Sequence, residues 1–277
     1  MKLALAQIAS TADRAANLQR ALRAMDEAGE AGADLIAFPE VVLDRFFPVE
    51  KGAGGCREAA HALAEPVPGP TVEKLQAKAR ERGLVTVFNL YERAGERFYD
   101  SSPVIDSDGS LLGVTRMVHI TDYEGFHEQD YYDPGDTGAP VYDTACGRVG
   151  VAICYDRHYP EYMRALAVAG ADLVVIPQAG ALGEWPEGLF EAEVRTAAFQ
   201  NGYFAALCNR VGVEDKMTFA GESFVTDPSG HMLARGRTLE EDLVVADLDL
   251  ATCAESPGRK LFMRDRRPGL YADWLSR

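Results

Sequence analysis

The fold of this chain is decided by residues 147–161, which read GRVGVAICYDRHYPE. Val149, Val151 and Ile153 recur at a period of two, the spacing typical of a buried β-strand. Cys154 follows where that strand should end, and a run with helical spacing begins a few residues later. A strand, a sharp turn that carries a nucleophilic side chain, and a helix together form a nucleophile elbow. The pattern therefore predicts an α/β fold with a reactive group at the carboxyl edge of a sheet.

Cys154 has two interpretations on these residues alone. In the first, it is a nucleophile that the elbow exposes, and iodoacetamide should then modify it faster than the other cysteines. In the second, it is an ordinary core cysteine, which is a common role for a free thiol. A base at the same edge of the sheet would favour the first interpretation.

Glu40 is the candidate for that base. A short buried strand, Asp34–Phe38, leads directly into Pro39 and Glu40. A carboxylate that directly follows a buried strand lies at the same sheet edge as the cysteine elbow, so Glu40 can activate Cys154 without a histidine. The other interpretation is that Glu40 is a helix-start carboxylate or a surface acid.

An internal repeat predicts the architecture. Residues 31–39 and 169–177 are close copies, AGADLIAFP and AGADLVVIP. Each copy follows a segment with helical spacing, residues 14–28 in the first case and 160–169 in the second. Two units of this kind predict a pseudo-symmetric sandwich in which helices cover two packed sheets.

Composition narrows the class of protein. The 277 residues carry a net charge of −15, which gives no attraction for nucleic acids or anionic membrane surfaces. No run approaches the roughly 20 apolar residues of a membrane span, and the apolar start is too short for a signal peptide. We therefore expect a small-molecule substrate. Because no linker divides the chain, we expect one domain over residues 1–277, with a core in about 1–248 and a tail in 249–277.

Cysteines and histidines give no sign of a metal site. The five cysteines are widely spaced, odd in number and form no C-x-x-C pair, so neither a zinc cluster nor a disulfide framework is indicated. Free thiols fit a reducing cytoplasm. The five histidines show no metal-binding spacing. We therefore expect a cytoplasmic protein without a metal.

Several motifs occur in a fixed order along the chain. They are FPE at 38–40, PGD at 134–136, ICYDRHYPE at 153–161, the long stretch 191–212 and SFVTDPSG at 223–230. Together they resemble the nitrilase superfamily of carbon–nitrogen hydrolases, from about Leu3 to Leu248. The resemblance is closest to the N-carbamoyl amidohydrolase and aliphatic amidase branches.

The resemblance implies a four-layer αββα sandwich that assembles as a homodimer or a higher homo-oligomer. It also implies a Glu–Lys–Cys triad that cleaves a linear amide or N-carbamoyl compound through a thioester, without a metal or organic cofactor. Cys154 matches the nucleophile, Glu40 the general base, and Glu128 the second glutamate that many members place beside the triad. The apolar side chains of Met163 and Leu166, on the predicted helix, would then pack in the dimer interface.

One position departs from the family pattern. The family lysine lies in a motif of the form Y-R-K-x-H, and here the corresponding run is TRMVH, which places Met117 at the lysine position. A lysine would stabilise the oxyanion beside the backbone N–H of Tyr155 and would lower the pKa of the thiol, and methionine can do neither. The predicted strand Leu111–Ile120 should carry Met117 into the site. Arg116 should then point to the opposite face, unless a bulge re-aims it.

Other side chains are candidates for substrate binding. Arg157, three residues after Cys154, can bind a carboxylate in bidentate fashion, as arginines in this region do in relatives that act on N-carbamoyl amino acids. The alternative for Arg157 is an ion pair with Asp156, Glu161 or another acid. Further candidates for the pocket wall are Asn89, Tyr123, Phe126, Trp185 and Glu187, and Tyr155 is a candidate for binding the substrate through its backbone N–H.

The sequence thus predicts a hydrolase of a linear amide or N-carbamoyl compound, with activity reduced by Met117. Two alternatives stay open. The first is a catalytically silent protein that binds small molecules and has lost the lysine. The second is a glutaminase domain that supplies ammonia to a separate synthetase polypeptide.

Overall fold

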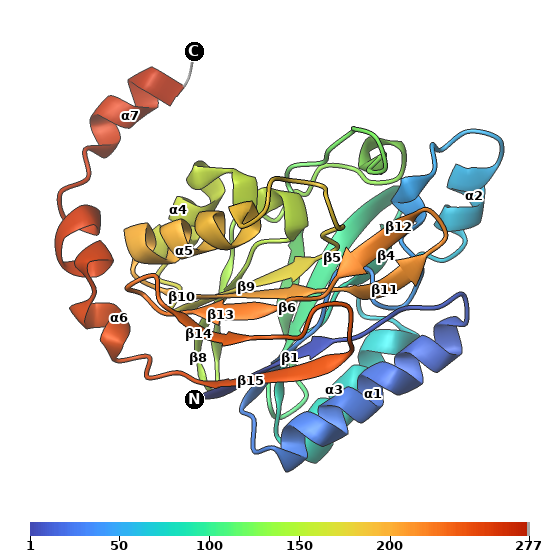
Figure 1. Cartoon of the computed structure of the whole chain (residues 1–277), viewed down its shortest axis with the longest axis horizontal. Helices are drawn as coiled ribbons and strands as arrows, with labels where there is room; N and C mark the ends of the chain where they lie inside the picture. Colours follow the sequence, from blue (N-terminus) through green and yellow to red (C-terminus); the bar gives the residue numbers. More distant parts are fainter. Residues whose placement is uncertain (276–277) are drawn as a thin grey trace.

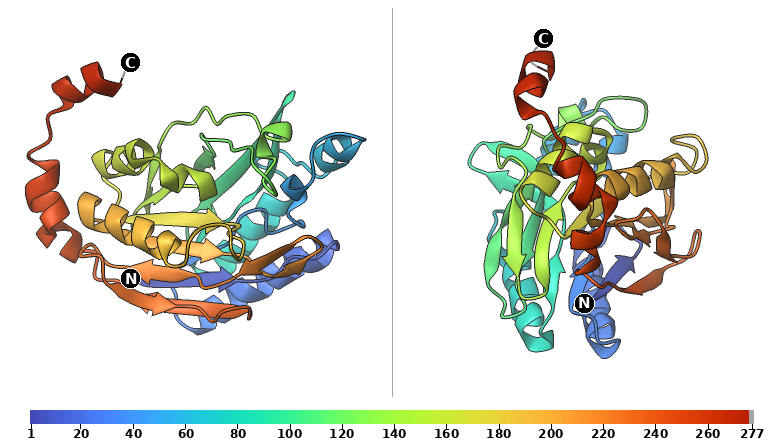
Figure 2. Two further views of the ribbon diagram at one scale, coloured as in Figure 1. Left: turned by 45° about the horizontal axis from the view of Figure 1, so that its top comes forward. Right: turned by 90° about the vertical axis from the view of Figure 1, so that its left-hand side faces the viewer.

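A computed structural model describes residues 1–275. It shows four layers, with two β-sheets packed face to face and helices outside them (Figures 1 and 2). The predicted αββα sandwich is therefore confirmed. In the described residues, no helix combines the length and the apolar character that crossing a membrane requires.

The first sheet has seven strands in the order β15-β1-β2-β3-β5-β4, with β6 paired to β5. Its central strands β1, β2 and β3 run parallel, and β15 and β5 flank them antiparallel. The strands of this sheet are β1 (Lys2–Gln7), β2 (Leu35–Ala37), β3 (Val85–Val87), β4 (Leu90–Ala94), β5 (Arg97–Ile105), β6 (Leu111–Arg116) and β15 (Asp242–Asp247).

The second sheet has six strands in the order β14-β13-β10-β9-β8-β7, and β11 and β12 form a separate hairpin. Strands β8, β9 and β10 run parallel at its centre. The strands are β7 (Val141–Thr144), β8 (Gly147–Val151), β9 (Leu173–Gln178), β10 (Phe204–Asn209), β11 (Val211–Glu214), β12 (Met217–Ala220), β13 (Phe224–Thr226) and β14 (Met232–Arg235).

Helices α1 and α3 cover the outer face of the first sheet, and α4 and α5 cover the second (Figure 1). Asp13 caps α1 by accepting from the backbone N–H of Ala16 at 3.0 Å. The helices are α1 (Arg14–Glu30), α2 (Cys56–His61), α3 (Pro70–Arg82), α4 (Pro160–Val168), α5 (Leu189–Asn201), α6 (Thr252–Glu255) and α7 (Pro268–Leu275), with short turns η1 (Phe47–Val49), η2 (Glu128–Asp130), η3 (Cys154–His158) and the π-helical η4 (Gly258–Met263).

The repeated sequence occupies equivalent places in the two sheets. Its copies form β2 and β9, each the middle of three parallel strands. The carbonyl of Asp34 accepts from the N–H of Val85 at 3.0 Å, and that of Asp172 accepts from Phe204 at 2.9 Å. In both copies, the segment AGAD therefore leads into a strand that pairs in parallel with the next strand of its sheet, β2 with β3 and β9 with β10. A shared apolar core between the sheets buries side chains from both copies.

The structure corrects two expectations about extended and exposed segments. The strand predicted over Leu111–Ile120 ends at Arg116. The N–H of Met117 still donates to the carbonyl of Asp100 in β5, but those of Val118 and His119 donate to the side chain of Asp156 and leave the sheet. Met163 and Leu166 point into the core under α4 and not toward a partner, since they are 1% and 0% exposed.

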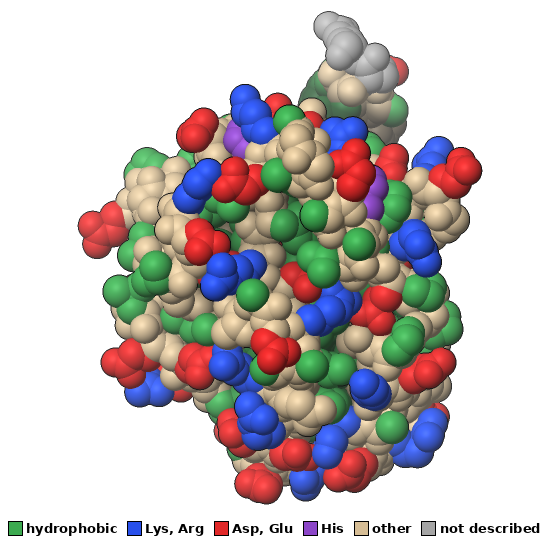
Figure 3. Space-filling view, turned by 90° about the vertical axis from the view of Figure 1, so that its right-hand side faces the viewer, with side chains coloured by type: hydrophobic (Ala, Val, Ile, Leu, Met, Phe, Trp, Pro, Cys, Tyr) green, Lys and Arg blue, Asp and Glu red, His purple; other side chains and the backbone are tan. Residues whose placement is uncertain are grey.

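The last helix, α7, contributes no buried residue and extends from the body at the C-terminal end (Figure 2). On the face shown in Figure 3, acidic and basic side chains are interspersed with apolar ones. That face therefore carries no extended area of a single sign of charge.

Candidate active site

Cys154 lies on the elbow that the sequence predicts. β8 ends at Val151, Cys154 opens the tight turn η3, and α4 follows. The φ of Cys154 is +42°, a value that is uncommon for a residue with a side chain and that costs backbone strain. This backbone conformation directs the thiol toward the carboxyl edge of the parallel strands. The expectation that the elbow exposes the thiol was wrong, because Cys154 is only 5% exposed whereas Cys56 is on the surface.

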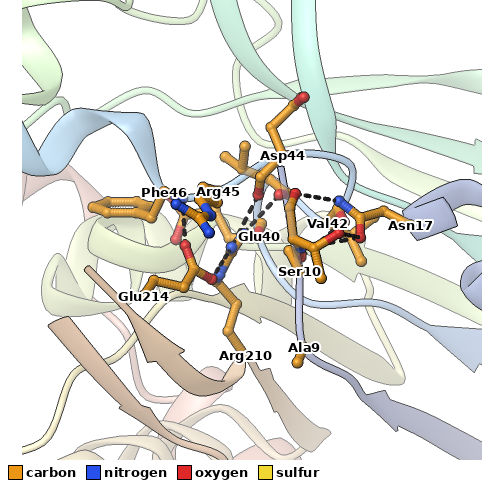
Figure 4. A network of polar contacts seen from close by, with 12 residues as sticks. Ala9, Ser10, Asn17, Glu40, Val42, Asp44, Arg45, Phe46, Arg210 and Glu214 are labelled. Atoms are coloured by element: carbon orange, nitrogen blue, oxygen red, sulfur yellow. Dashed lines mark hydrogen bonds and ion pairs between the residues drawn. The ribbon is translucent and has the colours of Figure 1, made fainter. Parts of the chain in front are cut away.

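Glu40 follows β2 after Phe38 and Pro39 and is fully buried. Its loop is held by Arg210, whose guanidinium donates to the carbonyls of Glu40 at 2.8 Å and Val41 at 2.6 Å (Figure 4). Arg210 also forms an ion pair with Glu214, which accepts from the N–H of Phe46 at 2.7 Å. The backbone that carries Glu40 is thus fixed by a buried charge from the segment after β10.

Three predicted side chains converge. A carboxylate oxygen of Glu40, a carboxylate oxygen of Glu128 and the sulfur of Cys154 all lie within 4.8 Å of one another. Both oxygens of Glu40 and Oε1 of Glu128 are buried without a hydrogen-bond partner, and the other oxygen of Glu128 accepts from Thr121 at 3.4 Å. These side chains therefore face a shared space and not the surrounding protein.

Asp100 is a fourth acidic group, and the sequence interpretation missed it. It lies in β5, is 1% exposed, and its pKa is raised by the nearby charge of Glu40. Oδ1 of Asp100 accepts from Asn89 at 2.6 Å, and Asn89 in turn accepts from the N–H of Val41 at 2.6 Å. Asn89 therefore fixes the acids in place and does not form the pocket wall that was predicted.

Burial and mutual repulsion raise the pKa of every acid in this cluster. Burial, followed by the nearby charge of Glu128, raises the pKa of Glu40 to about 7. Burial and Asp100 raise the pKa of Glu128 well above its usual value, and burial and Glu40 do the same for Asp100. Burial, Glu40 and Glu128 likewise raise the pKa of the Cys154 thiol. At neutral pH Glu40 can therefore both accept and release a proton.

Met117 is fully buried and packs in the same apolar cluster as Cys154. Its N–H donates to the carbonyl of Asp100 at 2.9 Å, and its carbonyl accepts from Gly135 of the PGD motif at 2.8 Å. A Cβ on Gly135 would lie 2.7 Å from the Met117 carbonyl oxygen and closer still to that of Arg116. The glycine thus permits the close approach of two backbones that seats Met117.

Arg116 does not supply the missing charge. Its guanidinium forms ion pairs with Glu92 at 2.6 Å and Asp136 at 2.8 Å, and it stacks over the ring of Tyr99. Both partners lie outside the group formed by Cys154, Glu40 and Glu128. Asp156 holds the segment after Met117 from the other side, because it accepts from the N–H and the ring of His119.

Arg157 is 3% exposed and forms an ion pair with Glu193, Nε to Oε2 at 3.2 Å. Of the two interpretations of Arg157, the ion pair with an acid is therefore the one found, and the acid is Glu193. Arg157 also donates to the carbonyl of Cys154 at 2.9 Å and to the side-chain oxygen of Gln178 at 2.7 Å. The amide of Gln178 donates to the sulfur of Cys154 at 3.3 Å. Gln178, also missed, therefore connects the arginine to the thiol.

A cavity of about 620 Å³ is formed by the loop segments 123–126 and 181–184 and by the hairpin of β11 and β12. Tyr123 and Glu184 line it, and the Tyr123 hydroxyl donates to Glu184 at 2.6 Å. The negative charge of Glu184 contributes to the raised pKa of the Cys154 thiol. Tyr155 follows Cys154, with its ring 6.5 Å from that of Tyr123. Glu187, by contrast, is exposed and does not line this cavity.

An elbow cysteine facing two glutamates at the edge of a four-layer sandwich defines the class of carbon–nitrogen hydrolases. The carbon-nitrogen hydrolase family model matches residues 2–257, and the chain belongs to this family. The resemblance to the nitrilase superfamily and the expectation of a carbon–nitrogen hydrolase are therefore confirmed.

Relatives and solved structures agree with this assignment. The chain is 33% identical to N-carbamoylputrescine amidase of Solanum lycopersicum, over 97% of this chain and 93% of that protein. It is similar to a carbon-nitrogen hydrolase from Helicobacter pylori G27, with a TM-score of 0.89, 28% identity and coverage of 99% and 98%. It is also similar to a mutant of an amidase from Nesterenkonia sp. AN1, with a TM-score of 0.81, 28% identity and coverage of 99% and 96%, in which the acetamide moiety of fluoroacetamide is covalently added at the active-site cysteine.

Proposed function

We propose that this carbon–nitrogen hydrolase cleaves a linear amide or N-carbamoyl compound through a thioester on Cys154, with Glu40 as the general base. The observation that carries the proposal is the convergence of Glu40, Glu128 and Cys154 within 4.8 Å, two of them with unpartnered buried oxygens. The covalent adduct on the active-site cysteine of the Nesterenkonia amidase supports the assignment of the nucleophile. The tomato relative supports the substrate class.

The reaction begins when Glu40 accepts the thiol proton of Cys154 and the sulfur attacks the carbonyl carbon. Glu40 then gives that proton to the departing nitrogen, the C–N bond breaks, and ammonia or an amine leaves. Water attacks the thioester while Glu40 accepts its proton, and the C–S bond breaks to restore the thiol. A pKa of about 7 suits a group that accepts and donates in alternation. Glu128 orients Glu40 or the leaving nitrogen.

The oxyanion of this reaction receives one hydrogen bond from the backbone N–H of Tyr155. Met117 cannot donate a second, and removing one such donor typically costs about 10²–10³ in rate. We therefore propose that this enzyme hydrolyses simple amides slowly.

The test measures ammonia released from acetamide, N-butylurea and L-glutamine by the wild type, Cys154→Ser and Cys56→Ser. The exposed Cys56 is the matched control, because its replacement removes a thiol on the surface. We expect slow release with the wild type and Cys56→Ser and none with Cys154→Ser. Binding of an amide without any release would favour the silent binding protein, and release from L-glutamine alone would favour the glutaminase.

We also propose a homodimer in a reducing compartment. An apolar groove of about 770 Å³ between α4 and the C-terminal segment supports the dimer, since Val168 and Phe262 line it and stay partly exposed. The five free cysteines support the compartment. Light scattering at micromolar concentration should give twice the 30.1 kDa chain mass.

A further inference from the structure

The acid cluster lacks a positive charge of its own. Glu40, Asp100 and Glu128 are each no more than 1% exposed. Four of their oxygens have no hydrogen-bond partner: both of Glu40, Oδ2 of Asp100 and Oε1 of Glu128. A buried acceptor without a partner is costly, and native proteins rarely leave one unsatisfied. Four in one cluster indicate a group that is bound during function.

Nearby cations are already committed to other partners. Arg210 is paired with Glu214 and Arg157 with Glu193. Arg116 faces away toward its own two acids. Within residues 1–275 no lysine is buried, so none reaches the cluster. The missing cation is therefore not a side chain of the described protein.

We propose that the reacting group of the substrate is itself a cation, an amidinium or guanidinium, which this enzyme binds among Glu40, Asp100 and Glu128 and hydrolyses. This inference rests on the proposed role of Cys154 and replaces the neutral amide by a cationic analogue. Such groups are planar and carry several N–H donors in a fixed fork, a shape that matches carboxylate oxygens. Their N–H groups would satisfy the four unpartnered oxygens.

The change in charge when the thiolate adds to the substrate explains why methionine at position 117 suits a cation. A thiolate that adds to a neutral amide produces an oxyanion, which needs a donor such as lysine. A thiolate that adds to an amidinium produces a neutral tetrahedral adduct, because the positive charge cancels the negative one. No oxyanion forms in this step. A lysine would also repel the bound cation, whereas methionine does not.

The atoms balance as follows. The Cys154 sulfur forms a bond to the central carbon, and the C=N π pair moves to nitrogen. Glu40 gives a proton to the departing nitrogen, the C–N bond breaks, and ammonia leaves behind a thioimidate or isothiouronium on sulfur. Water adds to that carbon while Glu40 accepts its proton, and the C–S bond breaks to release a neutral amide or urea. Overall, an amidinium and water give an amide and an ammonium ion.

The surroundings favour a cation as well. Glu184 is a further acid, and its charge acts on the Cys154 thiol. The net charge of −15 attracts small cations at long range, and the attraction weakens with salt.

Matched pairs of substrates test the proposal: acetamide against acetamidine, and N-butylurea against N-butylguanidine. Ammonia release gives kcat/KM for the wild type, Met117→Lys, Asp100→Asn and Cys154→Ala. We expect the wild type to prefer each cation over its neutral partner by at least about tenfold. Met117→Lys should invert this preference, and Asp100→Asn should reduce it by about tenfold. Cys154→Ala should be inactive on all four compounds.

Calorimetry on folded Cys154→Ala separates binding from chemistry, and circular dichroism confirms that each variant is folded. Acetamidine should bind more tightly than acetamide, and the additional substitution Met117→Lys should abolish the difference. Turnover of the amides with no preference for the cations would overturn this inference and leave the proposed function intact. The absence of any turnover or adduct with all four compounds would overturn both.

Discussion

Replacing Arg210 by methionine should destabilise the protein through the loop that carries Glu40. The change removes charge-assisted hydrogen bonds to the carbonyls of Glu40, Val41 and Asp44, at 2.8, 2.6 and 2.9 Å, and leaves Glu214 buried without its cation. Breaking a buried pair from one side typically costs about 3–5 kcal/mol. Folded domains are stable by only about 5–15 kcal/mol, so this loss is a large fraction of the total.

Urea unfolding of Arg210→Met, Glu214→Gln and the double variant measures this effect. Because glutamine is neutral and still accepts from the N–H of Phe46, the double variant should be more stable than the sum of the single losses predicts, by about 1–3 kcal/mol. Amide hydrolysis should fall in Arg210→Met under folded conditions, since Glu40 loses its support. The positioning role of Arg210 would be refuted if Arg210→Met lowered the free energy of unfolding by less than about 1 kcal/mol, or if the losses of the two single variants added up to that of the double variant.

The remaining predictions concern pH, thiol reactivity, packing and the lysine position. Since Glu40 has a raised pKa of about 7, amide kcat/KM should rise as pH increases through 7. Folding stability should fall as pH rises from about 4.5 to 7, because folded Glu40 holds a proton that the unfolded chain has lost; Glu40→Gln should make this fall smaller but not abolish it, since Asp100 and Glu128 also have raised pKa values. Iodoacetamide followed by peptide mapping should modify Cys56 before Cys154, whose thiol is buried and has a raised pKa; rapid loss of Cys154 would contradict the structure. Gly135→Ala should lower thermal stability and activity together, because its Cβ would meet the backbone at Met117, and an unchanged melting temperature would show that the two segments can separate. Met117→Lys should raise amide kcat/KM by about 10²–10³, and a neutral or harmful effect would show that another donor already serves the oxyanion.

The features that could be predicted from the sequence are those that depend on neighbouring residues, namely two central strands and the elbow at Cys154. The copied AGAD segments place β2 and β9 correctly, and the alternation before Cys154 predicts the elbow, because both follow from neighbouring residues. Asp100 and Gln178 escaped notice because they lie within strands, β5 and β9, that look ordinary in sequence and reach the site only by sheet pairing. The pattern that could have identified Asp100 is a charged residue followed by two serines within a strand.

Loop and support residues were predicted less well, for a physical reason. Glu184 and Glu187 are three residues apart in one loop, and only its folded path decides which of them faces the cavity. Arg210 acts through carbonyls of a segment 166–170 residues away, a contact that no local periodicity encodes. Met163 and Leu166 were assigned to a partner interface because helical spacing identifies an apolar face but not what covers it.

The central claim is that Cys154 forms the covalent intermediate and that Glu40 moves its proton. Rapid quenching of the wild type with a reactive amide, followed by mass spectrometry of the peptides, tests it most directly. The account predicts an acyl group on the peptide that contains Cys154, lost as product forms, slower to appear in Glu40→Gln and absent in Cys154→Ser. Product formation that survives Cys154→Ser, or an acyl group on Cys208 or Cys253 instead, would contradict it.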